Sequence, residues 1–226
     1  MWETVTTGLS GAVVTRRAGV YRKTSDDQGH DLVAEGERLR WLRARGIPAA
    51  EVLTCRPGLL ETAEVPGRPA SEHWPMADRP RIVDALADFT RRLHALPVAE
   101  CPFDRRLAVT IPEALAADVA LDMLDAERAG WDRDQLVARL VATRPALEDL
   151  VVCHGDLCLP NVLLDPVTCE VTGVVDVGRL GVADRWADLA LTTRSLVGDG
   201  DRFLDRYGIP LDPAKLEFYR LLDEFF

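Results

Sequence analysis

The segment from Val151 to Arg179 constrains this chain more than any other, because it sets polar residues at fixed spacing among short apolar stretches. Asp156 stands five residues before Asn161, and Asp176 ends a second apolar run, two residues before Gly178. A carboxylate can orient the proton of a hydroxyl group, while an amide and a second carboxylate supply the oxygen atoms that Mg²⁺ prefers. The spacing therefore predicts a phosphoryl-transfer site.

The same spacing is typical of the catalytic loop and the metal-binding Asp-Phe-Gly segment of kinases. His154-Gly155-Asp156 stands where protein kinases have His-Arg-Asp, and an activation loop ending in Ala-Pro-Glu is missing. These departures favour a kinase that acts on a small molecule. We expect His154 to hydrogen-bond to backbone and keep the shape of the loop, without a part in the chemistry.

Composition and charge limit the possible partners. With 226 residues, of which 47% are hydrophobic and 28% charged, the chain can bury the core of one domain or of a compact two-lobed one. The formal net charge of -10 argues against nucleic acid or an anionic membrane as a partner. It is compatible with a cationic substrate, although an acidic balance is also common among soluble proteins.

Cysteine usage and the absence of targeting signals favour the cytoplasm. The five cysteines are scattered, and none shares zinc-site spacing with a histidine, so we expect reduced thiols. Cys153 and Cys158 flank the catalytic loop as packing residues rather than nucleophiles. The first residues lack the basic and apolar regions of a signal peptide, and no window approaches the roughly 18 apolar residues of a membrane span.

Hydrophobic periodicity predicts two lobes of different composition. Residues 1–63 carry strand patterns at 2–7, 12–16, 20–23, 52–54 and 59–62, and one helix pattern from about Asp31 to Arg45. A turn is expected at Ala18-Gly19, and the last two strands are expected to form a hairpin across residues 55–58. Glu64 to Gly67 breaks the pattern, so we place the lobe boundary there. Residues 64–226 are mainly helical, with helices expected at 80–95, 111–124, 133–141, 185–196 and from Pro213 to the end. Short strands are expected at 150–153 and in a hairpin over 161–177.

With these motifs in place, the chain resembles the aminoglycoside phosphotransferases, most closely the 3'-phosphotransferases of actinomycete antibiotic producers. The resemblance covers essentially the whole chain and is densest over 149–194 and 218–226. It implies an α+β, protein-kinase-like fold with a small β-rich N-terminal lobe that binds nucleotide and a larger helical C-terminal lobe. It also implies ATP and Mg²⁺ as cofactors, and resistance through phosphorylation of an aminoglycoside, expected at the 3'-hydroxyl.

The resemblance assigns the catalytic and metal-binding residues one by one. Asp156 matches the catalytic aspartate that orients the sugar hydroxyl; otherwise it would be a capping aspartate in a turn. Asn161 and Asp176 match the metal ligands, although an asparagine after Pro160 also fits plain turn chemistry.

The nucleotide-binding residues follow from strand-then-helix order and from the resemblance. Lys23 matches the lysine that meets the phosphates, and Glu35 the acid that holds it, with Arg22 and Glu37 as the competing cation and acid. The loop over the phosphates and the adenine-binding segment supply the remaining expected contacts, which are Ser10, Gly11, Thr62 and Ala63.

Acidic residues dominate the expected substrate side, because an aminoglycoside carries several ammonium groups. The positions that match the family are Asp125, Arg179, Arg194, Asp223, Glu224 and Phe226. The acidic C-terminus could instead be a frayed helix end. Arg179 could instead pair only with Asp184 or Asp188, two carboxylates nearby in sequence.

Two departures from the family affect substrate choice and the size of the first lobe. Met123, Ala126 and Ser195 stand where the family is expected to offer acids, so the binding of a polyamine-like substrate should be weaker. Met1 falls almost on the glycine-containing loop, so the nucleotide lobe is short for the family; a minimal lobe and a trimmed one fit equally.

Three rival functions stay open at this stage. The first is phosphorylation of the 3''-hydroxyl of streptomycin, since the stretches 8–17 and 101–107 also resemble streptomycin enzymes. The second is a choline-type or sugar kinase with the same fold. The third is a degenerate kinase that binds nucleotide without turnover. Oligomeric state and the choice between ATP and GTP do not follow from the sequence.

Overall fold

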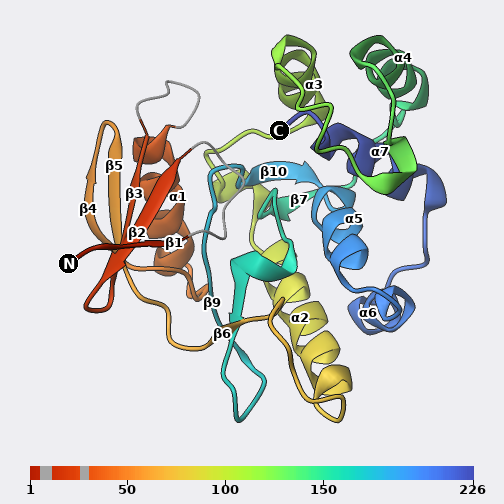
Figure 1. Ribbon diagram of the computed structural model, residues 1–226. Coiled ribbons are helices and arrows are strands. Elements are labelled where there is room, and N and C mark those ends of the chain that lie inside the picture. Colours follow the sequence, from red (N-terminus) through yellow and green to blue (C-terminus); the bar gives the residue numbers. More distant parts are fainter. Residues whose placement is uncertain (6–11, 26–30) are drawn as a thin grey trace.

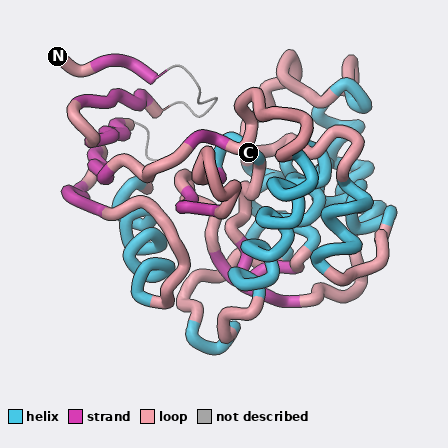
Figure 2. The backbone as a smooth tube through the Cα atoms, turned by 90° about the horizontal axis from the view of Figure 1, so that it is seen from below, coloured by secondary structure: helices cyan, strands magenta, loops and turns pink. Residues whose placement is uncertain are grey.

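The chain separates in space into a sheet-rich N-terminal part and a mainly helical remainder (Figures 1 and 2). The structure is a computed structural model that describes residues 1–5, 12–25 and 31–226. Ser10 and Gly11 therefore lie outside the described residues. The arrangement confirms the expected α+β class and, with the structural relatives given below, the protein-kinase-like fold. The exact boundary after residue 63 stays a prediction.

An antiparallel five-stranded sheet forms the N-terminal part, with the strand order β1-β2-β3-β5-β4. Its strands are β1 (Glu3–Val5), β2 (Val13–Arg17), β3 (Val20–Thr24), β4 (Val52–Arg56) and β5 (Leu59–Ala63). The predicted hairpin of β4 and β5 is confirmed. The predicted turn between β2 and β3 is confirmed as well, with Ala18 and Gly19 both at positive φ.

Helix α1 (Leu32–Ala44) packs on β4 and β5 of this sheet. Asp31 caps its first turn by accepting from the backbone N–H groups of Val33 and Ala34, at 3.1 and 3.0 Å. Gly36 permits the close packing, because a Cβ atom there would lie 2.5 Å from Cys55 Sγ. The approach places Glu35, on the same buried side of the helix, beside strand β3.

Helices make up most of the remaining chain. They are α2 (Arg79–His94), α3 (Leu107–Ala116), α4 (Arg133–Thr143), α5 (Trp186–Ser195), α6 (Gly200–Tyr207) and α7 (Pro213–Asp223), with short 3₁₀ turns η1 (Val98–Glu100), η2 (Ala126–Arg128) and η3 (Leu159–Asn161). Helix α5 packs against both α6 and α7, and α2 against α6. In the described ranges, no helix combines the length and the apolar character needed to cross a membrane.

Two small sheets carry the segments that the sequence singled out. Strand β7 (Leu150–Cys153) pairs with β10 (Gly181–Asp184), and β8 (Val162–Leu164) lies between β6 (Arg68–Pro69) and β9 (Val171–Val174). The backbone of Val174 bonds to Pro48 and Ala50, which joins β9 to the N-terminal part. The loops that follow β7 and β9 therefore meet beside the five-stranded sheet.

The predicted helix over 111–124 is wrong in its position. Helix α3 begins at Leu107, whose N–H donates to Glu148 Oε1 at 2.8 Å, and ends at Ala116. A side chain 41 residues away thus fixes its start, which local periodicity cannot reveal. Helix α6 and strand β10 were not anticipated, because each is short and owes its place to packing on α2 or pairing with β7.

Candidate functional site

Helix α5 holds the backbone of the candidate catalytic loop that follows β7. Asp188 accepts from the N–H groups of His154 and Gly155, both at 2.8 Å, and Thr192 Oγ1 donates to the carbonyl of Leu157 at 2.7 Å. Gly155 has φ +86°, and a Cβ atom there would lie 2.2 Å from the carbonyl oxygen of Arg179. The backbone conformation of the loop is therefore fixed here, and only glycine fits at this position.

His154 is fully buried and bonds to backbone on both sides, as expected from the sequence. Its Nε2 lies 3.1 Å from the carbonyl of Val175, and its Nδ1 accepts from the N–H of Asp156 at 3.3 Å. A neutral ring protonated at Nε2 satisfies both partners at once. The ring thereby joins the loop after β7 to the segment that leads to Asp176.

Asp156 lies at the centre of the site with a different partner on each oxygen. Asn161 Nδ2 donates to its Oδ2 at 2.9 Å, while Arg179 Nη2 lies 3.2 Å from its Oδ1. Its side chain is 26% exposed, so a hydroxyl group can reach it. The carboxylate is therefore held in orientation and yet open to an acceptor, which is the geometry that a general base or a hydroxyl-orienting group requires.

Lys23 joins the five-stranded sheet to the Asp176 segment. Its Nζ lies 3.0 Å from Glu35 Oε2 and 2.9 Å from Asp176 Oδ1. Burial opposes the charge of this ammonium group, but the two carboxylates outweigh it and raise the pKa of Lys23. Burial also tends to raise the pKa of Asp176, but the charge and hydrogen bond of Lys23 leave it below its ordinary value. Burial dominates at Glu35, whose pKa is raised.

The competing nucleotide-side candidates have other contacts. Arg22 bonds to Glu61 at 2.9 Å and stacks on the ring of Trp2, and Glu37 is exposed.

Thr62 pairs with Tyr21 in the sheet. The N–H of Ala63 donates to the carbonyl of Glu51 at 2.8 Å, so this donor is already engaged. These positions favour Lys23 with Glu35 for the phosphates, and the assignments of Thr62 and Ala63 to adenine stay predictions.

Asn161 and Asp176 provide oxygen atoms suited to Mg²⁺. Asn161 uses its amide nitrogen internally, donating to the Asp156 carbonyl at 2.9 Å as well as to the Asp156 carboxylate. The amide oxygen is then the atom that remains for a ligand. Asp176 keeps a negative charge because of Lys23, and φ +57° turns its backbone sharply at the end of the loop. An amide oxygen and a carboxylate fit a hard divalent cation.

Acidic and basic side chains alternate among the residues expected to bind the substrate. Asp223, at the end of α7, bonds to Arg179 at 2.8 Å and to Arg194 at 2.6 Å. Arg194 also bonds to Asp125 at 2.8 Å. Because Arg179 contacts Asp156 too, the structure connects the candidate catalytic carboxylate to the acidic C-terminal helix. Both arginines have a raised pKa, since these carboxylates outweigh the cost of burial.

The alternative pairing of Arg179 with Asp184 or Asp188 is wrong. Lys215 bonds to Asp184, and Asp188 bonds to His94 and to the loop backbone, so both carboxylates have partners other than Arg179. Phe226 is half-exposed, and its ring lies 5.7 Å from the Arg179 guanidinium carbon.

Sequence reasoning missed two contacts near the site. Arg128 is buried and bonds to Glu224 at 3.0 Å, so this predicted substrate residue has a partner within the protein. The signal was an arginine three residues after Asp125 in an otherwise acidic loop. Cys158 Sγ accepts from Asn161 Nδ2 at 3.2 Å, and burial raises the pKa of this thiol. The thiol is therefore inert and helps to orient Asn161.

Comparisons with known proteins agree with this geometry. The model of the family described as "Phosphotransferase enzyme family" matches residues 4–221. An aminoglycoside 3'-phosphotransferase of Streptomyces fradiae is 48% identical over 100% of this chain and 95% of its own length. That alignment runs over 254 positions, more than the 226 residues here, so the relative has internal stretches without a counterpart.

Solved structures give the same relationship. A type VIII aminoglycoside 3'-phosphotransferase superposes with a TM-score of 0.90 at 47% identity, covering 100% of this chain and 94% of its own. A 3''-type aminoglycoside phosphotransferase of Streptomyces rimosus, solved with ADP and streptomycin, has a TM-score of 0.86 at 37% identity and covers 99% and 92%. This chain belongs to the phosphotransferase enzyme family to which the aminoglycoside phosphotransferases belong.

Proposed function

We propose that this chain phosphorylates a hydroxyl group of an aminoglycoside antibiotic with ATP, at the 3'-position, and thereby confers resistance. The position of Asp156 carries the proposal. It lies between Asn161 on the side of Lys23 and Asp176, and Arg179 on the side of the acidic helix end. An acceptor hydroxyl and a nucleotide phosphate could therefore meet at this one carboxylate. The relatives reported above support the substrate class.

Each group has a defined part in the proposed reaction. Lys23, held by Glu35, binds the phosphates of ATP, and Asp156 orients the acceptor hydroxyl and accepts its proton. The transition state of phosphoryl transfer is loose, so positioning and charge neutralisation supply most of the acceleration. Asn161 and Asp176 would hold Mg²⁺, which neutralises phosphate charge when bound. We place the protein in the cytoplasm, where ATP is available.

Streptomycin is a second candidate acceptor. The 3''-type relative was solved with streptomycin, and the predicted acidic set of this chain is thinned at Met123, Ala126 and Ser195. In addition, both Asp125 and Asp223 are already bonded to Arg194. Fewer free carboxylates would suit an acceptor with fewer ammonium groups.

A coupled ATPase assay with Mg²⁺ on the purified protein tests the proposal. We expect turnover with kanamycin and none with lividomycin, which lacks a 3'-hydroxyl. Turnover with streptomycin alone would move the acceptor to the 3''-hydroxyl. Nucleotide binding without turnover on any antibiotic would refute the enzymatic proposal and favour a non-catalytic relative.

Two variants separate the roles of the carboxylates. Asp156→Ala should abolish turnover and leave ATP binding nearly intact, because Asp156 serves the acceptor. Asp176→Ala should remove the Mg²⁺-dependent part of ATP binding, measured by calorimetry with and without the metal. A rate within tenfold of the parent in either variant would overturn that assignment.

A further inference from the structure

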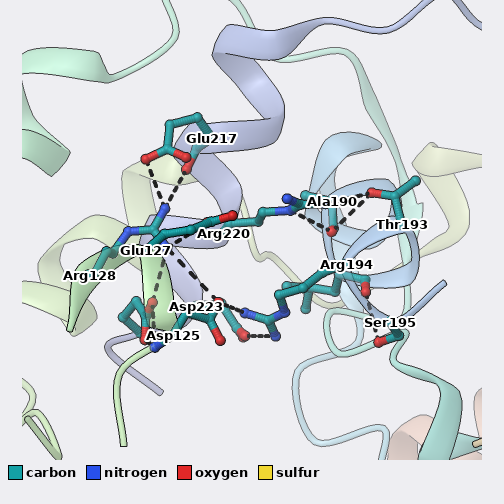
Figure 3. A network of polar contacts seen from close by, with 12 residues as sticks. Asp125, Glu127, Arg128, Ala190, Thr193, Arg194, Ser195, Glu217, Arg220 and Asp223 are labelled. Atoms are coloured by element: carbon teal, nitrogen blue, oxygen red, sulfur yellow. Dashed lines mark hydrogen bonds and ion pairs between the residues drawn. The ribbon is translucent and has the colours of Figure 1, made fainter. Parts of the chain in front are cut away.

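Arg128 is buried against the C-terminal helix α7 and bonds to two glutamates, one on this helix and one directly after it. Its side chain is only 1% exposed and comes from η2. Nη2 lies 2.8 Å from Glu217 Oε1, and Nη1 lies 3.0 Å from Glu224 Oε1. The two glutamates are seven residues apart, which is about two turns of α7. Figure 3 shows the guanidinium group reaching across to Glu217 on α7.

Stability alone does not explain this buried arginine. Taking a guanidinium group out of water is costly, and a buried ion pair is often no more stabilising than apolar residues of the same volume. Among the described residues, the buried Nε of Arg128 has no hydrogen-bond partner, so the cost is only partly offset. The consequence of the contact is therefore geometric, because a planar guanidinium group fixes two carboxylates at a set distance.

Glu224, one of the two anchored positions, belongs to a closed ring of contacts. Glu224 follows Asp223, which bonds to Arg194 at 2.6 Å, and Arg194 bonds to Asp125 at 2.8 Å. The N–H of Asp125 lies 3.3 Å from both carboxylate oxygens of Glu224. Asp125 is only three residues before Arg128, which closes the ring through η2. Arg194 and Asp125 are seen together in Figure 3.

The ring of contacts is connected to Asp156, the candidate catalytic carboxylate, through Arg179. Asp223 also bonds to Arg179 at 2.8 Å, and Arg179 lies 3.2 Å from the carboxylate of Asp156. A movement of the end of α7 would therefore displace Asp223, Arg179 and Arg194 together. The nucleotide groups, Lys23 and Asp176, have no contact with Arg128 or its two glutamates among the contacts of the described residues.

We propose that Arg128 is a positioning residue for acceptor binding, an inference that rests on the proposed function. It sets the place of the end of α7, so that Asp223 and Asp125 present their carboxylates to the acceptor. Glu224 is then part of the anchor: its side chain is 7% exposed and its charge is paired with Arg128. The expected contact between Glu224 and a substrate ammonium group stays a prediction.

Steady-state kinetics on two variants test the inference. Arg128→Lys keeps the charge but loses the planar fork, and Glu217→Gln weakens the half-exposed end of the anchor without touching the ring. Glu127→Gln is the matched control: the Glu127 carboxylate lies 3.9 Å from the same arginine, but the Glu127 side chain is 62% exposed. The KM for ATP, the KM for the antibiotic that the parent phosphorylates, kcat and the melting temperature are measured for each.

We expect Arg128→Lys to raise the KM for the antibiotic about tenfold and Glu217→Gln about threefold, with kcat and the KM for ATP within twofold of the parent. Glu127→Gln should match the parent. An unchanged antibiotic KM in an active Arg128→Lys variant, or equal changes for both substrates, would overturn the inference. If Arg128→Lys does not fold, the antibiotic KM of Glu217→Gln decides. A parent without turnover on any antibiotic would instead refute the proposed function, and the inference with it.

Discussion

Asp188 offers the sharpest test of how the fold holds the catalytic loop. This carboxylate is fully buried, accepts from the N–H groups of His154 and Gly155 at 2.8 Å, and lies 3.0 Å from His94 Nε2. Asp188→Asn keeps the shape of the side chain but replaces one acceptor oxygen with an NH₂ group. In either orientation that group would face a backbone N–H donor, that of His154 or that of Gly155, and one buried group would stay unsatisfied.

The expected loss of stability is large. Two backbone donors lose a charged acceptor, and each such hydrogen bond contributes about 1.5–3 kcal/mol, so the loss should be about 3–5 kcal/mol. This is a substantial part of the roughly 5–15 kcal/mol that stabilises a domain. For a urea m-value of about 2–3 kcal/mol/M, the midpoint of unfolding should fall by about 1.5 M. Because the loop carries Asp156, we also expect kcat to fall by at least about tenfold in the fraction that stays folded.

The loss should depend on pH in a defined direction. Burial alone would raise the pKa of Asp188, but the hydrogen bond and charge of His94 hold it below the ordinary value of 3.8. A carboxyl group whose pKa is lower in the folded state stabilises the fold above the unfolded pKa, and this contribution is lost as the pH falls through the folded pKa. The difference between parent and variant should therefore shrink as the pH falls below about 4.

Urea titration followed by tryptophan fluorescence, repeated at several pH values, measures the loss of stability and its pH dependence. Asp84→Asn is the control, since Asp84 is a more exposed helical aspartate that pairs with Arg202 at 2.7 Å and should cost less than about 1 kcal/mol. If Asp188→Asn were no more destabilising than Asp84→Asn, the buried carboxylate would not hold the loop as described.

Two further substitutions test the nucleotide side and the loop backbone. Lys23→Met should raise the KM for ATP by one to two orders of magnitude and leave the KM for the antibiotic unchanged. The reason is that the ion-pair partners of Lys23 among the described residues are Glu35 and Asp176, on the proposed nucleotide side. Equal changes in both KM values would contradict this. Gly155→Ala should lower the unfolding free energy by roughly 2 kcal/mol or more, since its Cβ would meet the Arg179 carbonyl at 2.2 Å. Gly208→Ala, at φ +92° with open space around it, is the matched control in urea titration and should lose less than Gly155→Ala.

Local pattern was enough for most of the fold. The helices now seen as α1, α2, α4, α5 and α7 were predicted from apolar residues at helical spacing, and the β4–β5 hairpin from its turn residues. Helix α3 shows the limit, because its first turn is fixed by the distant side chain of Glu148. Helix α6 is eight residues long, and two of its arginines bond to Asp84 and Asp88 of α2. Such contacts between distant segments leave no periodic trace in the sequence.

The candidate site divides in the same way. Asp156, Asn161 and Asp176 could be found because their chemistry requires fixed spacing within one segment. Lys23 lies 153 residues from Asp176, and strand-then-helix order and the family resemblance pointed to it. Arg128 was missed, although it is an arginine in an otherwise acidic loop, because a charged residue in such a loop is expected to be exposed. Only its burial against α7 reveals that it has a structural partner.

The pairing of charges also changes what the acidic composition means for the substrate. The net charge of -10 and the acidic C-terminus suggest unpaired carboxylates that are available to bind ammonium groups. In the structure, Asp223 is bonded to two arginines and Asp125 to one of them. An incoming ammonium group must therefore share these carboxylates with guanidinium groups, and only the difference between the two interactions contributes to affinity. Selectivity on this side then depends on where the arginines hold the carboxylates more than on how many carboxylates the sequence contains.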